Sequence, residues 1–267
     1  MKGVQVIVIG ELINGMYKDV RKAITGKEAD VIQHLAEDQV KAGAGALDVN
    51  TGPYSKNPKE DMKWLIECIQ KVTDVPLSID STKFDVIEEG LKLAKNRAII
   101  NSTNADEERM SRIFELAKRY NARVIGLTMD KSGVPNNKEK RLEVAATIVA
   151  KAIDYGINVE DLFLDPIVLP VNVAQSQGVE VLESIREFKL LSDPAPNTIV
   201  GLSNASQGAK LRSLVNRTFL VMAVASGLTA AILDPLDKEL MDAMIAAELI
   251  LNKNIYCDSF LDAYRKK

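Results

Sequence analysis

The sequence has few of the side chains on which many enzyme sites depend: its 267 residues include one histidine, two cysteines and one tryptophan. His34 falls on a predicted helix before the second strand, so neither a histidine-based metal triad nor a Ser-His-Asp triad is built around it. Cys68 and Cys257 lack the paired spacing of a zinc site and fit a reducing compartment. We therefore expect no metal bound by this chain's own side chains.

An excess of positive charge is also missing. The 34 basic and 37 acidic residues are mixed along the chain and give a formal net charge of -3, which provides no field for capturing nucleic acid or an anionic membrane. The apolar run in the opening segment MKGVQVIVIGE is far too short for a signal peptide or a membrane span. We expect a cytoplasmic protein without nucleic-acid or membrane partners.

Short β-branched apolar runs alternate with longer amphipathic stretches from end to end, which predicts repeated strand-helix units and a parallel sheet. Eight such units predict a (β/α)8 TIM barrel, a single domain over residues 1–267, with a doubly wound open sheet as the alternative. The predicted strands are Val4 to Ile9, Ala46 to Val49, Leu77 to Ile79, Ala98 to Ile100, Arg123 to Leu127, Leu162 to Leu164, Thr198 to Leu202 and Ala230 to Leu233.

Helical periodicity appears between these runs. One apolar stripe consists of Met62, Leu65, Ile66, Ile69 and Val72, and a second consists of Met110, Ile113, Phe114 and Ala117. Asn57 before Pro58 and Asp106 after Asn104 predict the helix starts.

Polar side chains follow each predicted strand, where barrel enzymes place their chemistry. Any one of them is explained by helix capping or a turn. Asp80, Asn101, Asp165 and Asn204 come directly after strand residues, so we expect their side chains to face the barrel mouth and a ligand rich in hydrogen-bond donors. The full set is Glu11, Asn14, Asp48, Asn50, Asp80, Ser81, Asn101, Asn104, Thr128, Asp130, Asp165, Ser203, Asn204, Gln207 and Asp234.

Two familiar barrel chemistries lack their residues. A Schiff-base enzyme needs a lysine at a strand end, whereas Lys83 and Lys131 lie past those ends and are expected to be solvated. The last two loops, GLSNASQG and LDPLD, place acidic residues where a phosphate would be repelled, which disfavours a phosphosugar substrate.

Ordered segments spread from about Val6 to Phe260 closely resemble the methyltetrahydrofolate:corrinoid protein methyltransferases. That family belongs to the pterin-binding barrels, with dihydropteroate synthase and the folate module of cobalamin-dependent methionine synthase. Its members move a methyl group between N5 of tetrahydrofolate and the cobalt of a separate corrinoid protein, usually as homodimers. The segments are VIGELINGM, LDVNTGP, SIDSTK, INSTN, GLTMDKSG, LDPIVLPVNVAQ, DPAPNTIVGLSNASQ, NRTFL and YCDSF.

The resemblance implies roles for residues in these segments. Asp80, Asn101 and Asp165 match residues that hydrogen-bond the pterin ring, whose pyrimidine edge presents an amino group and ring N–H donors. Asn204 matches the asparagine that hydrogen-bonds N5, and we expect it to assist catalysis with Asp165 and Asp80. Gly201, Ser203, Gln207 and Arg212 match positions that line or support the folate site, although Arg212 also fits a helix-surface ion pair.

The resemblance also implies substrates and partners. Tetrahydrofolate or 5-methyltetrahydrofolate is the substrate, and the corrinoid is carried by a partner protein, because the motif Asp-x-His-x-x-Gly that supplies a cobalt ligand is missing here. The direction stays open between methyl donation in acetyl-CoA synthesis (the Wood-Ljungdahl pathway) and methyl return to tetrahydrofolate in O-demethylation. Two alternatives remain: a dihydropteroate synthase-like enzyme, which needs basic groups for a diphosphate, and a non-catalytic folate-binding protein.

Overall fold

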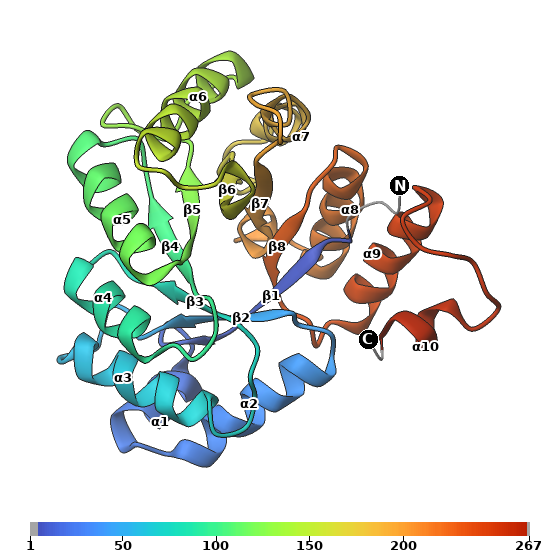
Figure 1. The fold of residues 1–267 in the computed structure, drawn as a ribbon. Coiled ribbons are helices and arrows are strands. Elements are labelled where there is room, and N and C mark those ends of the chain that lie inside the picture. The colour runs from blue at the N-terminus through green and yellow to red at the C-terminus, as the bar shows by residue number, and fades with distance from the viewer. Residues whose placement is uncertain (1–4, 266–267) are drawn as a thin grey trace.

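Eight parallel strands close into a barrel, each hydrogen-bonded to its neighbours in chain order, with β8 beside β1 (Figure 1). This is the structure of residues 5–265 in a computed structural model. The predicted single-domain (β/α)8 barrel is confirmed, and the open sheet is excluded by the pairing of β1 with β8. The strands are β1 (Ile7–Asn14), β2 (Ala46–Asn50), β3 (Leu77–Asp80), β4 (Ile99–Thr103), β5 (Arg123–Leu127), β6 (Leu162–Asp165), β7 (Asn197–Gly201) and β8 (Ala230–Leu233).

Helices surround the barrel and connect successive strands (Figure 1). Within the described residues, no helix is both long enough and apolar enough to cross a membrane. The helices are α1 (Lys18–Gly26), α2 (Ala29–Lys41), α3 (Pro58–Ile69), α4 (Phe84–Leu93), α5 (Glu107–Tyr120), α6 (Lys138–Asp154), α7 (Gln177–Phe188), α8 (Arg212–Ala225), α9 (Lys238–Ile250) and α10 (Phe260–Arg265), with short 3₁₀ turns η1 (Val159–Asp161) and η2 (Leu202–Ser206).

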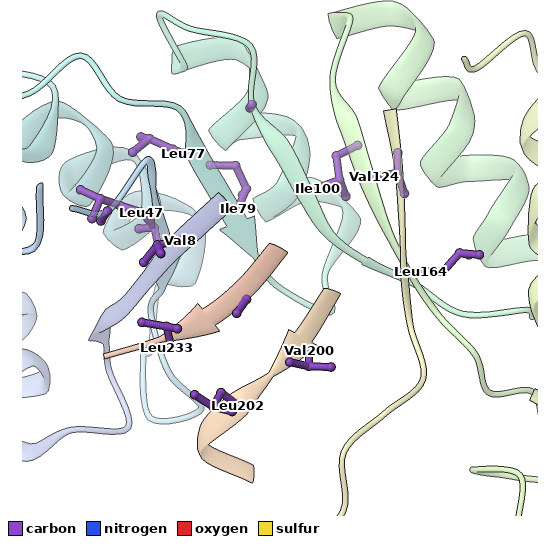
Figure 2. Packing of buried hydrophobic residues seen from close by; sticks show 14 of the residues in the cluster. Val8, Leu47, Leu77, Ile79, Ile100, Val124, Leu164, Val200, Leu202 and Leu233 are labelled. Carbon is purple, nitrogen blue, oxygen red and sulfur yellow. The ribbon is translucent and has the colours of Figure 1, made fainter. Parts of the chain in front are cut away.

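Alternation along the strands divides the core into two layers, because successive strand side chains point to opposite faces. One set packs between the sheet and the helices, as Figure 2 shows for Val8, Leu47, Ile100, Val124 and Leu164. The other set fills the inside of the barrel and comprises Ile9, Ala46, Ile99, Ile125, Phe163, Ile199 and Ala230. Both faces of the strands are therefore apolar, which explains their nearly continuous hydrophobic sequences.

Most predicted elements are confirmed, and their ends need correction. The first strand was expected to end at Ile9, but β1 runs on to Asn14 through an irregularity between Gly10 and Ile13; Val4 lies outside the described residues. The seventh strand ends at Gly201, because Leu202 begins a 3₁₀ turn.

The helix starts are confirmed at both predicted positions. Asn57 precedes α3 with Pro58 in its first turn, and the Asp106 side chain accepts a hydrogen bond from the backbone N–H of Arg109 at the start of α5. The first apolar stripe was extended too far: α3 ends at Ile69, and Val72 packs on the core from the loop that follows.

Candidate active site

The alternation that fills the barrel also directs polar side chains into its mouth. Asp80, Asn101 and Asp165 each lie two residues after an inward-facing position on β3, β4 and β6, so their side chains share the inner face. Asp48, on β2, obeys the same alternation two residues after Ala46. In a parallel barrel these strand ends meet on one rim, which brings the three predicted pterin-facing residues together.

A hydrogen-bonded cluster joins β2, β3 and β4. Asn101 Nδ2 donates to Asp48 Oδ1 across 3.0 Å, and Ser78 Oγ donates to the same oxygen across 2.7 Å. Asn50 Nδ2 donates to Asp80 Oδ2 across 2.6 Å. Burial raises the pKa of Asp48 well above its usual range, reinforced by the nearby Asp80 carboxylate, and burial also raises the pKa of Asp80. These carboxyls therefore gain from a ligand that donates hydrogen bonds.

Asp165 is buried on the opposite side of the mouth, with 8% of its surface exposed. Its Oδ1 accepts a hydrogen bond of 2.7 Å from the backbone N–H of Ile167. Burial raises the pKa of Asp165 to about 7, although the Ile167 N–H and the Arg141 guanidinium both favour the ionised form. The carboxyl is consequently poised between its protonated and ionised forms near neutral pH.

Asn204 lies at the rim of the mouth, on the 3₁₀ turn after β7. Its side chain is exposed and makes no hydrogen bond to another described residue, so both ends of the amide are available to a ligand. Gly201 makes room for this amide, because a Cβ at position 201 would lie 3.1 Å from Asn204 Nδ2. A glycine at the end of β7 thus lets the asparagine lie against the strand.

The remaining predicted residues support this turn. Ser203 Oγ donates to Glu11 Oε1 across 2.6 Å and ties the turn to β1. Arg212 Nε donates to Ser206 Oγ across 3.1 Å, and its Nη2 donates to the Ser203 carbonyl across 3.4 Å. Arg212 therefore braces the turn and forms no surface ion pair within the described residues. Gln207 ends the turn with an exposed side chain, and its backbone N–H donates to the Asn204 carbonyl.

Asp80 and Asn50 also line a cavity of about 300 Å³ between the loops that follow β2 and β3. The loops after β1 and β2 lie so close together that a Cβ on Gly15 would lie 2.2 Å from the Thr51 carbonyl oxygen. Gly52, at φ +75°, also contacts Gly15 and donates its N–H to Asn50 Oδ1 across 2.6 Å. This hydrogen bond fixes the Asn50 amide that holds Asp80.

Other polar residues that the sequence offered lie away from the mouth. Lys83 and Lys131 are exposed, and Lys131 pairs with Asp106, which is consistent with solvated lysines. His34 is exposed on α2, where its Nδ1 contacts the Asp30 carbonyl. Asp130 caps its own turn through Ser132. In the described part of the chain, no group of three or more His, Cys, Asp or Glu side chains is placed to hold a metal ion.

Asp48, Asn50 and Glu11 were predicted among the polar residues of the barrel mouth but were given no role in binding or catalysis, and Arg141 was not predicted at all. Asp48 and Asn50 were visible as polar ends of the second strand, and the spacing of Asp48 from Ala46 was the signal that it faces inward. Glu11 was predicted to follow the first strand, whereas it lies within β1 and accepts the hydrogen bond from Ser203. Arg141 lies in the first turns of α6, where a sequence pattern gives no reason to expect a buried cation.

Comparisons with known proteins agree with this geometry. A family model described as pterin binding enzyme matches residues 18–234. A methylcorrinoid:tetrahydrofolate methyltransferase of Eubacterium limosum is 28% identical, and the match covers 97% of this chain and 96% of the relative. The methionine synthase of Mycobacterium leprae is 31% identical, and that match covers 85% of this chain but only 20% of the longer enzyme.

Solved structures share the fold. A Yersinia pestis dihydropteroate synthase with a pterine-sulfa conjugate superposes with a TM-score of 0.68 at 19% identity, covering 94% of each chain. The resemblance read from the sequence motifs is confirmed, and the family model spans most of the barrel, from α1 to the end of β8. The chain therefore belongs to the family of pterin-binding enzymes.

Proposed function

We propose that this chain is a methyltransferase that moves a methyl group between N5 of 5-methyltetrahydrofolate and the cobalt of a corrinoid carried by a separate protein. The observation on which the proposal rests is the inward convergence of Asp80, Asn101 and Asp165 at one barrel mouth. Support also comes from the Eubacterium limosum relative, which is named as a methylcorrinoid:tetrahydrofolate methyltransferase and matches nearly end to end.

Each of the three residues has one acceptor atom left for a ligand. Asp80 uses Oδ2 to hold Asn50, which leaves Oδ1; Asp165 uses Oδ1 to hold Ile167, which leaves Oδ2. Asn101 commits its Nδ2 to Asp48, which leaves its carbonyl oxygen. This set of three acceptors complements the amino and N–H donors of a pterin's pyrimidine edge.

Asn204 is the residue proposed to act at N5. Transfer to cobalt breaks the bond from carbon to N5: the methyl group leaves as a cation equivalent, both electrons of the new bond come from Co(I), which becomes Co(III), and N5 gains a proton. A tertiary amine is a poor leaving group, because N5 keeps the electron pair of the broken bond; a proton from solvent at the mouth must therefore reach N5, and a hydrogen bond must stabilise N5 as the bond breaks. The Asn204 amide, which has no hydrogen-bond partner among the described residues, donates or accepts at N5, while Asp165 and Asp80 organise the pterin protons.

The neighbours of Asn204 keep this amide in place. Gly201 admits the side chain, Ser203 ties the turn to Glu11, and Arg212 holds the Ser203 carbonyl. Gln207 closes the turn at the rim and is proposed to line the folate site. Asn204 is thereby presented toward the opening, where a partner's cobalt approaches the methyl group in line.

The partner is proposed to be a corrinoid protein that docks over the barrel mouth after folate is seated. The chain is further proposed to act as a cytoplasmic homodimer, with one domain across residues 1–267 and no metal of its own. Either direction of methyl transfer uses the same site. Copurification of the natural corrinoid protein distinguishes acetyl-CoA synthesis from O-demethylation.

Dihydropteroate synthase chemistry is the alternative enzyme function. It needs cations for a pterin diphosphate, yet the loop after β8 reads LDPLD, and Asp234 at its start has a pKa raised by burial. A non-catalytic folate-binding protein would retain the acceptors but has no need for an unpartnered Asn204 beside Gly201.

An absorbance assay tests the proposal. The protein is mixed anaerobically with 5-methyltetrahydrofolate and Co(I) cobalamin, and the loss of Co(I) is followed with the growth of methyl-Co(III). Protein-dependent methyl-Co(III) formation is expected. Folate binding without methyl transfer would favour the binding protein, and condensation of a pterin diphosphate with p-aminobenzoate would favour the synthase.

A further inference from the structure

Arg141 is a fully buried arginine on α6, outside the set of residues proposed to touch folate. Its Nε donates to the Pro166 carbonyl across 2.8 Å, and its Nη2 donates to Gln177 Oε1 across 2.9 Å. The side chain therefore joins α6 to the first residue of α7 and to the segment that leaves β6.

The hydrogen bond from Arg141 to the Pro166 carbonyl lies in the turn that holds the Asp165 carboxylate. Pro166 directly follows Asp165, and Ile167, the next residue, returns its N–H to Asp165 Oδ1 across 2.7 Å. Ile167 is held at φ +64°, a backbone conformation that is unfavourable for a β-branched residue and persists only where the surroundings enforce it. Arg141 supplies such a constraint by fixing the Pro166 carbonyl.

Arg141 is a poor choice for stability alone. Its Nη1 is buried and has no hydrogen-bond partner among the described residues, and burial lowers the pKa of its guanidinium although the charges of Glu180 on α7 and Asp165 oppose that shift. A buried charge with an unsatisfied donor is unfavourable, and apolar residues of similar volume often replace such groups without loss of stability. An arginine at this position is thus better explained by its effect on a neighbour.

We propose that Arg141 is a positioning residue, which fixes the turn after β6 and holds the Asp165 carboxylate oriented and ionised for the pterin edge. This inference rests on the proposed function. Burial raises the pKa of Asp165 to about 7, and Arg141 is the charged side chain that opposes this rise. Two other carboxyls of the mouth, Asp48 and Asp80, lie across the barrel on β2 and β3.

Loss of the Arg141 charge should raise the pKa of Asp165 further, since an adjacent cation lowers the pKa of a carboxyl. The neutral carboxylic acid has one acceptor fewer for the pterin. As the pH is lowered, the affinity for folate should therefore begin to fall at a higher pH in such a variant than in the wild type. Arg141→Gln removes the charge and retains a donor for the Pro166 carbonyl. Arg141→Lys retains the charge and one donor.

The test is equilibrium binding of 5-methyltetrahydrofolate from pH 5.5 to 9 without any corrinoid, for the wild type and both variants. Arg141→Gln should raise the pH midpoint of binding by about one unit, with about fivefold weaker binding at pH 7 and about tenfold weaker binding below pH 6. Arg141→Lys should stay within about half a unit of the wild type. Arg186→Met is the matched control, because Arg186 on α7 is 56% exposed and, among the described residues, pairs only with Glu183.

The outcomes separate the two proposals. A wild-type protein that binds no reduced folate at any pH overturns the proposed function. A wild type that binds with the same pH midpoint as Arg141→Gln overturns the role of Arg141 alone. A shift of equal size in the Gln and Lys variants also overturns it, because that pattern indicates general damage to the turn.

Discussion

Asn101 donates its side-chain amide to Asp48 across 3.0 Å, and this bond decides which end of the Asn101 amide faces a ligand. Asp48 is almost fully buried and accepts a second hydrogen bond from Ser78. Its Oδ1 atom holds the side chains of Asn101 and Ser78 through these two hydrogen bonds. The carboxyl is therefore a support for Asn101 in the proposed pterin site.

Asp48→Ala should weaken binding of 5-methyltetrahydrofolate by about tenfold, as expected when one charge-assisted hydrogen bond no longer fixes Asn101. Calorimetry at pH 8 measures the change. Ser78→Ala is the control, since it removes the other donor to Asp48 and keeps the Asn101 contact; its affinity should stay within about twofold. Equal losses in the two variants would contradict the orienting role.

Asn204→Ala should lower the rate of methyl transfer by roughly 10² to 10³, like the loss of one preorganised hydrogen bond at a developing charge. Folate affinity should change by less than about threefold, because the pterin edge is held elsewhere. Single-turnover stopped-flow with Co(I) separates the two quantities. Asn158→Ala serves as the control: Asn158 is an exposed asparagine without a capping hydrogen bond at the far end of β6. An unchanged single-turnover rate for Asn204→Ala would rule out its role at N5.

Gly201→Ala should slow methyl transfer by displacing the Asn204 amide, which lies 3.1 Å from the position of the new methyl group. The backbone at Gly201 has φ −80°, which alanine adopts freely, so the melting temperature should stay the same. The double variant Gly201→Ala with Asn204→Ala should be no slower than Asn204→Ala alone. Additive losses would show that Gly201 acts through some other contact.

Asp165 should make the stability of the ligand-free protein fall as the pH rises. Its pKa is about 7 in the folded protein against 3.8 for a free carboxyl, so its contribution is complete below about pH 4 and is lost as the pH rises through 7. Between pH 5 and pH 8 this loss is on the order of 2 to 3 kcal/mol.

The asparagine of the Asp165→Asn variant does not titrate. The free energy of unfolding of this variant, relative to that of the wild type, should therefore be higher at pH 8 than at pH 5. Urea unfolding at the two pH values measures the difference. Asp48 and Asp80 shift in the same direction and are common to both proteins, so they cancel in the comparison. A difference that does not vary with pH would contradict the raised pKa.

The sequence predicts the barrel because its strands are apolar on both faces and its helices have one apolar stripe, which are local and periodic signals. It also predicts Asp80, Asn101 and Asp165 at one rim, since each directly follows the last residue of a predicted strand. Whether these residues bind a pterin stays a prediction. The predicted end of the first strand was wrong, because β1 continues through an irregularity between Gly10 and Ile13 that the hydrophobic periodicity does not reveal.

The supporting residues could not be predicted from local pattern. The hydrogen bond from Ser203 to Glu11 spans 192 positions of the sequence. Arg141 bonds to Pro166 from α6, and other charged residues of this helix are exposed, so its sequence does not distinguish the buried arginine from those on the surface. Such contacts depend on how separate strand-helix units close around the barrel. Alternation along a strand shows where a side chain points, and only the folded chain shows what it meets.

A crystal structure of the protein with 5-methyltetrahydrofolate tests the central claim most directly. The account predicts that the pyrimidine edge contacts Asp80, Asn101 and Asp165, with N5 within hydrogen-bond distance of the Asn204 amide and the methyl group facing the open mouth. A folate bound outside the mouth, or one with its pyrimidine edge turned away from these three side chains, would contradict it.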